Sequence, residues 1–329
     1  MIGVTVVTYR LFLEMTKACI KNFLPESYQD KTVVIEPVMK NNGVVLQGLS
    51  VRNGETNKVE PVLYLEPFYK EYQDGRSLED VWRKIAEQYD AAQKEVQNVS
   101  ISIAYEKIKN GLFVSVCNAE QNAQRLQGIL HDIREDLALI YQSRIHLYDG
   151  QTGSMVINSR HLSHWGITKE QLQTDAWNNM KKVMPPVLLT MEEIQGQLEG
   201  KYSLEELSQK KSRSIEDAET DAFLYVLTNT EVTCGAVYMF DEELMARIAE
   251  RLDSNLLVLP SSTHEILILR ETEDVDVFDL RLMVEKINKD VVRPEDKLSD
   301  EVYRYDRAAH KLNVIKEQDY LQDWQIKME

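Results

Sequence analysis

The segment Ser261-Ser262-Thr263-His264-Glu265 holds residue types that could do chemistry. Side chains alternate along an extended chain, so Ser262 and His264 would point the same way. A hydroxyl beside an imidazole and a carboxylate suggests an activated nucleophile, with Ser262, His264 and Glu265 as the catalytic candidates. Neighbouring residues rarely converge as a triad must, however, and the chain lacks a Gly-x-Ser-x-Gly motif.

A structural turn is the alternative interpretation of this segment. Serines in turns commonly hydrogen-bond to nearby backbone groups, and His264 and Glu265 would then satisfy backbone or each other. A third interpretation makes Ser261 a contact for a ligand or a partner. The sequence favours the structural turn, because serine-rich turns are common and triads of adjacent residues are not.

Two further groups of residues are candidates for ligand or partner contact. His131 and Arg134 lie in a second polar segment, which we interpret as a turn, and they could act together with the Ser261–Glu265 turn. Tyr69 and Tyr72 belong to a set of aromatic residues around Pro67. Such a set is typical of a seam between elements, and a peptide-binding groove is the alternative.

We expect no metal and no cofactor. His161 and His164 could share one face of a helix, but metal binding would need further ligands such as His146 or Glu170, and nothing specifies one. Cys117 follows an apolar run and is expected to pack in the core, since a reactive thiol needs a cationic neighbour. Gly-rich phosphate loops, dinucleotide fingerprints, His-Glu-x-x-His and Cys-x-x-Cys motifs are all absent from the sequence.

Composition narrows the classes of function. The 329 residues carry a formal net charge of −16, which argues against sequence-independent nucleic-acid binding. An acidic surface could attract a basic protein partner, although a solubilising surface is the simpler interpretation. No apolar run approaches the roughly 18 residues of a membrane span, and the short apolar start lacks a basic leader. Three widely spaced cysteines favour a reducing cytoplasm. The oligomeric state cannot be predicted.

The helices and strands that position these residues are predicted most clearly by the sequence pattern from Asp221 to Arg270. Apolar runs at Phe223–Leu227 and Cys234–Phe240 predict a β-hairpin. Asp241 is expected to cap a helix with one apolar face, and strands are expected at Asn255–Leu259 and Glu265–Leu269. The continuous apolar run of the first of these two strands predicts that both its faces are covered.

The rest of the chain predicts an α+β fold with mixed or antiparallel sheets flanked by helices. We expect a small N-terminal part, residues 1–97, with a helix, a three-stranded meander and a helix capped by Ser77. Residues 98–329 should form a larger unit, with a helix capped by Thr168 and a polar, linker-like stretch near 200–218.

A weak internal repeat links two stretches of the larger unit. Leu112–Tyr141 and Phe223–Leu269 both run from a strand ending in Asn, through a helix and a polar segment with a His, to an apolar strand. We hypothesise that one half-domain is duplicated. Related strand orders in the two halves would be required.

Three segments together resemble a known family. The first is Lys40-Asn41-Asn42-Gly43, and the second is Tyr64-Leu65-Glu66 with Tyr72-Gln73-Asp74-Gly75. The third runs from Val226–Asn229 through Gly235-Ala236 to the Leu259–Glu265 segment. On these segments the chain resembles an uncharacterised bacterial family, catalogued as a domain of unknown function and frequent in anaerobic gut bacteria. The resemblance spans nearly the whole chain and implies no reaction, so no catalytic residue is carried over.

The sequence therefore predicts a non-catalytic cytoplasmic protein with an interaction or regulatory role, binding another macromolecule. A hydrolase or small-ligand-binding enzyme that uses the Ser261–Glu265 turn is the alternative. A concave, exposed turn with a convergent acid would favour the enzyme, and a buried turn with a binding surface elsewhere would favour the interaction protein.

Overall fold

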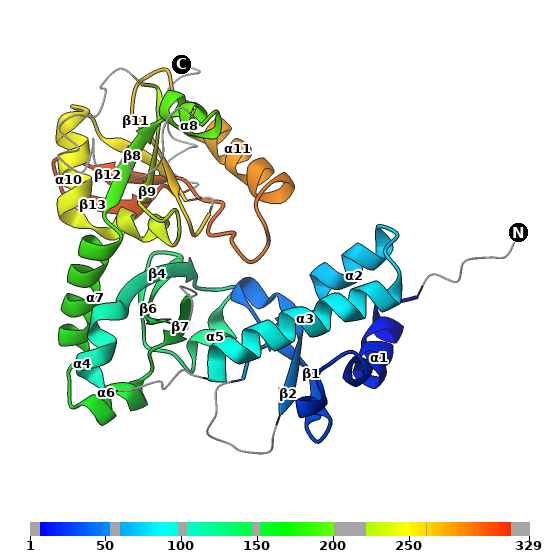
Figure 1. Ribbon diagram of the computed structural model, residues 1–329. Helices are drawn as coiled ribbons and strands as arrows, with labels where there is room; N and C mark the ends of the chain where they lie inside the picture. Colours follow the sequence, from blue (N-terminus) through cyan, green and yellow to red (C-terminus); the bar gives the residue numbers. More distant parts are fainter. Residues whose placement is uncertain are drawn as a thin grey trace, which may run out of the picture. The chain divides into compact units, whose positions relative to one another are not determined.

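The computed structural model describes residues 7–52, 60–97, 104–146, 152–200, 222–260 and 262–316. Helices and antiparallel sheets alternate through these ranges, which confirms the α+β class (Figure 1). The chain divides into two compact units, residues 1–102 with 145–153 and residues 103–144 with 154–329. The expected boundary at residue 97 stays a prediction, because residues 98–103 lie outside those described.

The smaller unit contains a three-stranded antiparallel sheet in the order β1-β2-β3 and three helices. Its elements are α1 (Tyr9–Cys19), the 3-10 helices Ile20–Asn22, Glu26–Tyr28 and Asn41–Gly43, β1 (Thr32–Met39), β2 (Val45–Arg52), β3 (Leu63–Tyr64), α2 (Glu66–Gln73) and α3 (Leu78–Gln97). The Ser77 hydroxyl accepts a hydrogen bond from the Asp80 backbone N–H at 3.2 Å, so the predicted cap of α3 is confirmed.

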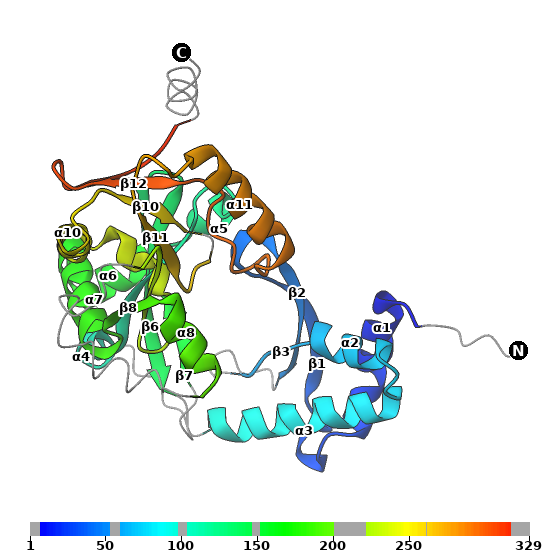
Figure 2. The same ribbon diagram turned by 90° about the horizontal axis from the view of Figure 1, so that it is seen from above.

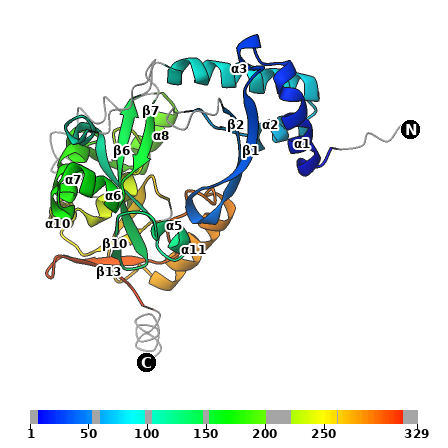
Figure 3. The same cartoon turned by 90° about the horizontal axis from the view of Figure 1, so that it is seen from below.

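One apolar stripe of α3 packs into the core of this unit. Figure 3 shows α3 beside the other helices and the sheet of the unit. The stripe's five residues at helical spacing are all buried: Val81, Trp82, Ile85, Ala86 and Tyr89. Two of them also satisfy polar partners. The Tyr89 hydroxyl accepts from the Val51 backbone N–H at 2.7 Å, and the Trp82 indole N–H donates to the Thr16 hydroxyl at 2.9 Å. Apolar burial and these bonds together fix α3 on α1 and β2.

The larger unit contains a four-stranded and a six-stranded sheet. Its elements are α4 (Tyr105–Ile108), the 3-10 helix Lys109–Gly111, β4 (Leu112–Asn118), α5 (Ala123–Leu126), β5 (His131–Arg134), β6 (Leu137–His146), β7 (Thr152–Val156), α6 (Ser159–Trp165), α7 (Lys169–Val183), β8 (Pro186–Thr190), α8 (Met191–Leu198), β9 (Leu224–Asn229), the 3-10 helix Gly235–Phe240, α10 (Glu242–Arg251), β10 (Leu256–Leu259), β11 (Ile266–Arg270), α11 (Val277–Asp290), β12 (Tyr303–Asp306) and β13 (Lys311–Val314).

The six-stranded sheet, in the order β13-β12-β10-β11-β9-β8, is covered on both faces. Helix α11 lies on one side of it and α10 on the other (Figures 1 and 2). Leu257 and Leu259 pack against Leu280 of α11, whereas Leu256 and Val258 belong to the main core with Ile248 of α10. All four residues of β10 are fully buried, which confirms the covered strand predicted from its apolar run.

The prediction of a β-hairpin with a strand at Cys234–Phe240 is wrong. Residues Gly235–Phe240 form a 3-10 helix, entered through Cys234 with a left-handed φ of 54°. Every residue from Gly235 to Met239 is buried. A short apolar run that is buried all round has no polar face, so its pattern cannot separate strand from helix.

The prediction of a turn at His131–Glu135 is also wrong. Residues His131–Arg134 form β5, which pairs antiparallel with β6, and only Glu135 has a left-handed φ, at 54°. Polar residues on an edge strand resemble a turn in sequence, because an edge exposes one of its faces to water.

The two stretches of the proposed repeat share a strand order. The first runs β4-β6-β5 and the second runs β9-β11-β10, with antiparallel pairing throughout. Asn118 and Asn229 end the first strand of each, and each side-chain oxygen accepts from backbone N–H groups that follow. This agreement supports the hypothesis of duplication, which superposition of the two stretches would test.

A hydrogen-bonded carboxylate, that of Asp132, joins β5 to α7 and β6. It accepts from Lys169 Nζ at 2.6 Å, from the Tyr141 hydroxyl at 2.5 Å and from Gln173 Nε2 at 2.7 Å. Burial raises its pKa, but the bonds from Lys169, Tyr141 and Gln173 outweigh burial and hold the pKa below its usual range.

Replacing Asp132 with Asn should lower the free energy of unfolding by about 1–3 kcal/mol at neutral pH. Because the folded-state pKa is depressed, the carboxylate stabilises the protein above its unfolded pKa of about 4, and this contribution is lost as the pH falls through the folded pKa. Urea unfolding of both proteins between pH 7 and pH 3 measures this. The difference in free energy of unfolding between the two proteins should be constant near neutral pH and should shrink in acid. A difference that grew in acid would contradict the assignment.

Candidate functional site

The segment after Pro260 is built into the larger unit by its backbone. Ser262 is 5% exposed and forms an isolated antiparallel bridge with Lys297. The Thr263 N–H donates to the Asp296 carbonyl at 2.8 Å, and the Ser262 hydroxyl accepts from the His264 N–H at 3.0 Å. The Ser262 hydroxyl therefore caps the turn that leads into β11. Ser261, which the sequence offered as a contact for a ligand or partner, lies outside the described residues.

Both ring nitrogens of His264 have structural partners. Nδ1 accepts from the Cys234 backbone N–H at 3.4 Å, and Nε2 lies 3.2 Å from Asp296 Oδ1. Asp296 also forms an ion pair with Arg293 at 2.6 Å. The acid that faces the imidazole is thus Asp296, which sequence reasoning missed because it is 32 residues away, and not Glu265.

The backbone of His264 is hydrogen-bonded as well as its ring. Its carbonyl accepts from the Gly235 N–H at 3.0 Å and from the Thr228 hydroxyl at 2.9 Å. A Cβ at position 235 would lie 2.5 Å from this carbonyl oxygen, so only glycine fits. The segment holds β9, β11 and the 3-10 helix together, which is the geometry of a structural turn.

The predicted tyrosine contacts have a structural place in the smaller unit. Tyr69 packs against Tyr9 with ring centroids 4.9 Å apart. Its hydroxyl donates to the Val7 carbonyl at 3.0 Å, while the Tyr72 hydroxyl accepts from the Val7 N–H at 3.1 Å. The two tyrosines bracket one residue of the chain, as expected of a seam between elements.

The structure separates His131 from Arg134. His131 Nδ1 lies 2.9 Å from the Ile129 carbonyl, and the His131 carbonyl accepts from Lys169 Nζ at 3.0 Å. Arg134, at the end of β5, instead lines a cavity of about 270 Å³ in the larger unit. Arg134 is the one predicted contact residue that the structure brings to this cavity.

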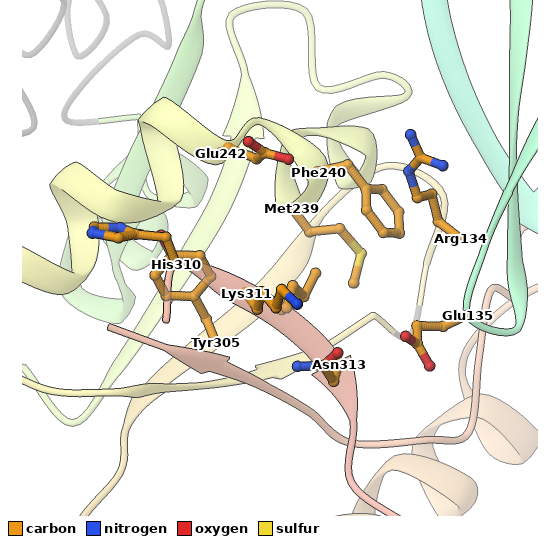
Figure 4. Close-up of a pocket in the computed structure, with 10 residues that line it drawn as sticks. Arg134, Glu135, Met239, Phe240, Glu242, Tyr305, His310, Lys311 and Asn313 are labelled. Atoms are coloured by element: carbon orange, nitrogen blue, oxygen red, sulfur yellow. The ribbon is translucent and has the colours of Figure 1, made fainter. Parts of the chain in front are cut away.

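The cavity lies among the end of β5, the start of α10 and the β12–β13 hairpin (Figure 4). In Figure 4, Met239, Phe240 and Lys311 lie between Arg134 and Glu135 on one side and Tyr305 and His310 on the other. Its lining residues are Arg134, Glu135, Met239, Phe240, Glu242, Tyr305, His310, Lys311, Leu312 and Asn313. A volume near 300 Å³ suits a small group such as one side chain rather than a large cofactor.

Apolar and aromatic groups form the floor of this cavity, and charged groups form its rim. Met239 and Tyr305 are buried, and Phe240 and Leu312 are half-buried. The rim carries two cations and two carboxylates, from Arg134, Lys311, Glu135 and Glu242. Among the described residues, these four side chains take part in no ion pair with one another or with any neighbour. Charges left unpaired around an apolar floor are available to a ligand.

The Tyr305 hydroxyl at the floor lies 3.3 Å from His310 Nδ1, and nearby carboxylates act on it. Burial raises the pKa of the Tyr305 hydroxyl, and the charges of Glu242, Glu250 and Asp306 raise it further. Asp306 stays ionised because the Ala309 and Ala308 N–H groups donate to its carboxylate, which lowers its pKa. A cationic group would therefore be favoured beside Tyr305.

The cysteines have the properties of packed thiols. None forms a disulfide. Burial raises the pKa of Cys117 to about 11 and also raises that of Cys234, whereas a nucleophilic cysteine needs a lowered pKa. His161 accepts from the Asn158 N–H and stacks on Trp165. Across the part of the chain that the structure describes, no three His, Cys, Asp or Glu side chains gather as a metal site.

The chain matches, over residues 9–307, the model of a family of unknown function, DUF5688, and it belongs to that family. The predicted membership of a family of unknown function is thereby confirmed, while the role of the three segments in the match stays a prediction. No curated protein and no solved structure matches the chain. Within the described ranges, no helix combines the length and apolar character that a bilayer span requires.

The structural role of the turn predicts a stability effect. Replacing Ser262 with Ala should lower the free energy of unfolding by about 1–2 kcal/mol, because the His264 N–H loses its buried acceptor. Ser163→Ala, on the exposed face of α6, is the matched control and should change stability by less than about 0.5 kcal/mol. Thermal and urea unfolding measure both. Equal stability of the two variants would contradict a capping role for Ser262.

Proposed function

We propose that this chain is a non-catalytic cytoplasmic protein that binds a protein partner through the cavity between β5, α10 and the β12–β13 hairpin. The carrying observation is the combination of an apolar floor with four rim charges unpaired among the described residues. Such a site holds an apolar side chain and can pair with charged groups on either side of it. This is the pattern of an anchor pocket in a protein interface.

The arrangement of the Ser262–Glu265 turn supports a role without catalysis. Ser262 is buried, and its hydroxyl oxygen accepts from the His264 backbone N–H, whereas a nucleophilic serine donates its hydroxyl proton to a general base. The His264 ring spans Cys234 and Asp296, so neither nitrogen is directed at a hydroxyl nucleophile. A hydrolase centred on this turn would need both groups to be released from structural bonds.

The setting of the protein is consistent with this proposal. Three cysteines without disulfides suit a reducing compartment such as the cytoplasm. A net charge of −16 disfavours nucleic acid and favours a basic protein partner.

Methyl resonances can test the pocket directly. With methionine methyl groups labelled, Met239 should shift on titration with the N-acetyl amides of leucine and phenylalanine, which supply an apolar side chain to the floor, and not with the aspartate derivative. Met239→Leu assigns the signal, and buried Met180 of α7 is the internal control. Leu312→Ala should weaken binding by roughly tenfold, since lost apolar contact costs on the order of 1 kcal/mol, whereas exposed Leu282→Ala should not.

Ester hydrolysis tests the enzymatic alternative. With p-nitrophenyl acetate, we expect rates equal for the native chain, Ser262→Ala and His264→Ala, since neither side chain is free to attack or to take a proton. A rate above background that disappears in both variants while they remain folded would favour the hydrolase and overturn the binding proposal.

A further inference from the structure

We propose that the partner at this cavity is an extended basic peptide that adds as a strand to the outer edge of β13 and inserts one apolar side chain over Met239, Phe240 and Leu312. This inference rests on the proposed function and specifies its ligand. Strand addition uses backbone hydrogen bonds for affinity and a side-chain pocket for specificity, and β13 offers both in one place.

The register shows which backbone groups of β13 face outward. The Ile315 N–H donates to the Val302 carbonyl at 2.9 Å, and Tyr303 pairs with Val314. Hydrogen-bonded and non-hydrogen-bonded pairs alternate in an antiparallel ladder. The N–H and C=O groups of Leu312 and Val314 therefore point away from β12. Strand β13 ends the six-stranded sheet, and no other described strand pairs with its outer side.

The pocket and the edge share a residue, so one ligand can use both. Leu312 faces the cavity with its side chain and presents its backbone groups at the open edge. Its pairing partner across the ladder is Tyr305, which is buried in the cavity floor. A peptide strand beside β13 would place alternate side chains on this same face. One of these side chains would lie over the cavity floor. The side chains two residues before it and two residues after it would reach the rim.

Charge selects a basic peptide over an acidic one. Glu242 and Glu135 line the cavity, Glu135 on the side opposite Tyr305, and the charges of Glu242 and Glu250 act on the Tyr305 hydroxyl. The cations Arg134 and Lys311 oppose them, but the chain as a whole carries −16. Lysines two residues before and after an apolar anchor would meet these carboxylates, and a free C-terminus or an acid further along could meet Arg134.

The test uses a designed nonapeptide in which lysine and threonine alternate around a central leucine, so that lysines and leucine share one face. Its affinity is measured by fluorescence anisotropy. Two isomers carry two N-methyl groups each, either on the residues next to leucine or on those two places away. The N–H groups of only one of these two pairs of residues can face β13. The isomer methylated on that pair should therefore bind at least about tenfold more weakly, while the other isomer binds as the parent peptide does.

Protein variants repeat the test from the other side. Val314→Pro removes an outward N–H and leaves the ladder to β12 intact, so it should weaken the parent peptide severalfold, while Val314→Ala should not. Lys311→Gln should tighten binding and Glu242→Gln should weaken it. Thermal unfolding checks that each variant is folded, and the methylated peptides need no variant at all.

The outcomes separate the two proposals. If central leucine matters but both methylated isomers bind equally, the pocket stands and strand addition is overturned. If aspartate in place of leucine binds as well, or no peptide binds, the pocket proposal fails as well. Concentration-dependent dimerisation without peptide, lost in Val314→Pro, would assign the edge to a second copy of this chain and overturn the peptide.

Discussion

The contact between Gly235 and the His264 carbonyl is the constraint on which the larger unit depends. Strands β9 and β11 meet the 3-10 helix there, and a Cβ at position 235 would lie 2.5 Å from the His264 carbonyl oxygen. Since Gly235 begins the 3-10 helix, its position sets where Met239 and Phe240 fall and therefore where the cavity floor lies. The most conspicuous polar segment of the sequence thus helps to form the cavity without lining it.

A second polar network joins the first stretch of the proposed repeat to residues 298–303, at and just before β12. Asp136, in the β5–β6 turn, accepts from the Ser299 hydroxyl at 2.6 Å and from the Tyr303 hydroxyl. Asn118 Nδ2 donates to the Leu298 carbonyl at 3.0 Å. All three bonds join residues more than 160 positions apart, so they close the fold around its core. Buried polar groups satisfied in this way specify one arrangement of the sheets and discriminate against others.

Local patterns predicted the elements whose apolar residues repeat at one period. The buried stripe of α3, the Thr168 cap of α7 and the covered strand β10 all follow from spacing and capping chemistry. The 3-10 helix after Cys234 and the strand β5 did not, because one is buried all round and the other is a polar edge. Of the cavity, only Arg134 was predicted. Arg134, Met239 and the β12–β13 hairpin that carries Tyr305 and Lys311 are far apart in the chain and share no local motif, so only the fold brings them together.

The turn residues are hydrogen-bonded within the fold, whereas the rim charges of the cavity form no ion pair among the described residues. This difference favours the cavity over the turn as the place where a partner would bind. Ser262, His264 and Asp296 are matched to partners through hydroxyl, ring and carboxylate, and a group that is fully bonded gains little from meeting a ligand. The rim charges gain more, because a ligand that excludes water from the floor strengthens each ion pair it makes there. A motif rich in reactive residue types can therefore serve the fold, while a less conspicuous set of residues around an edge strand keeps its interactions for a partner. Edge strands are commonly protected from unspecific pairing by charged side chains, and β13, which ends the six-stranded sheet, carries Lys311. In the proposed complex, a peptide of suitable charge would still have access to this edge.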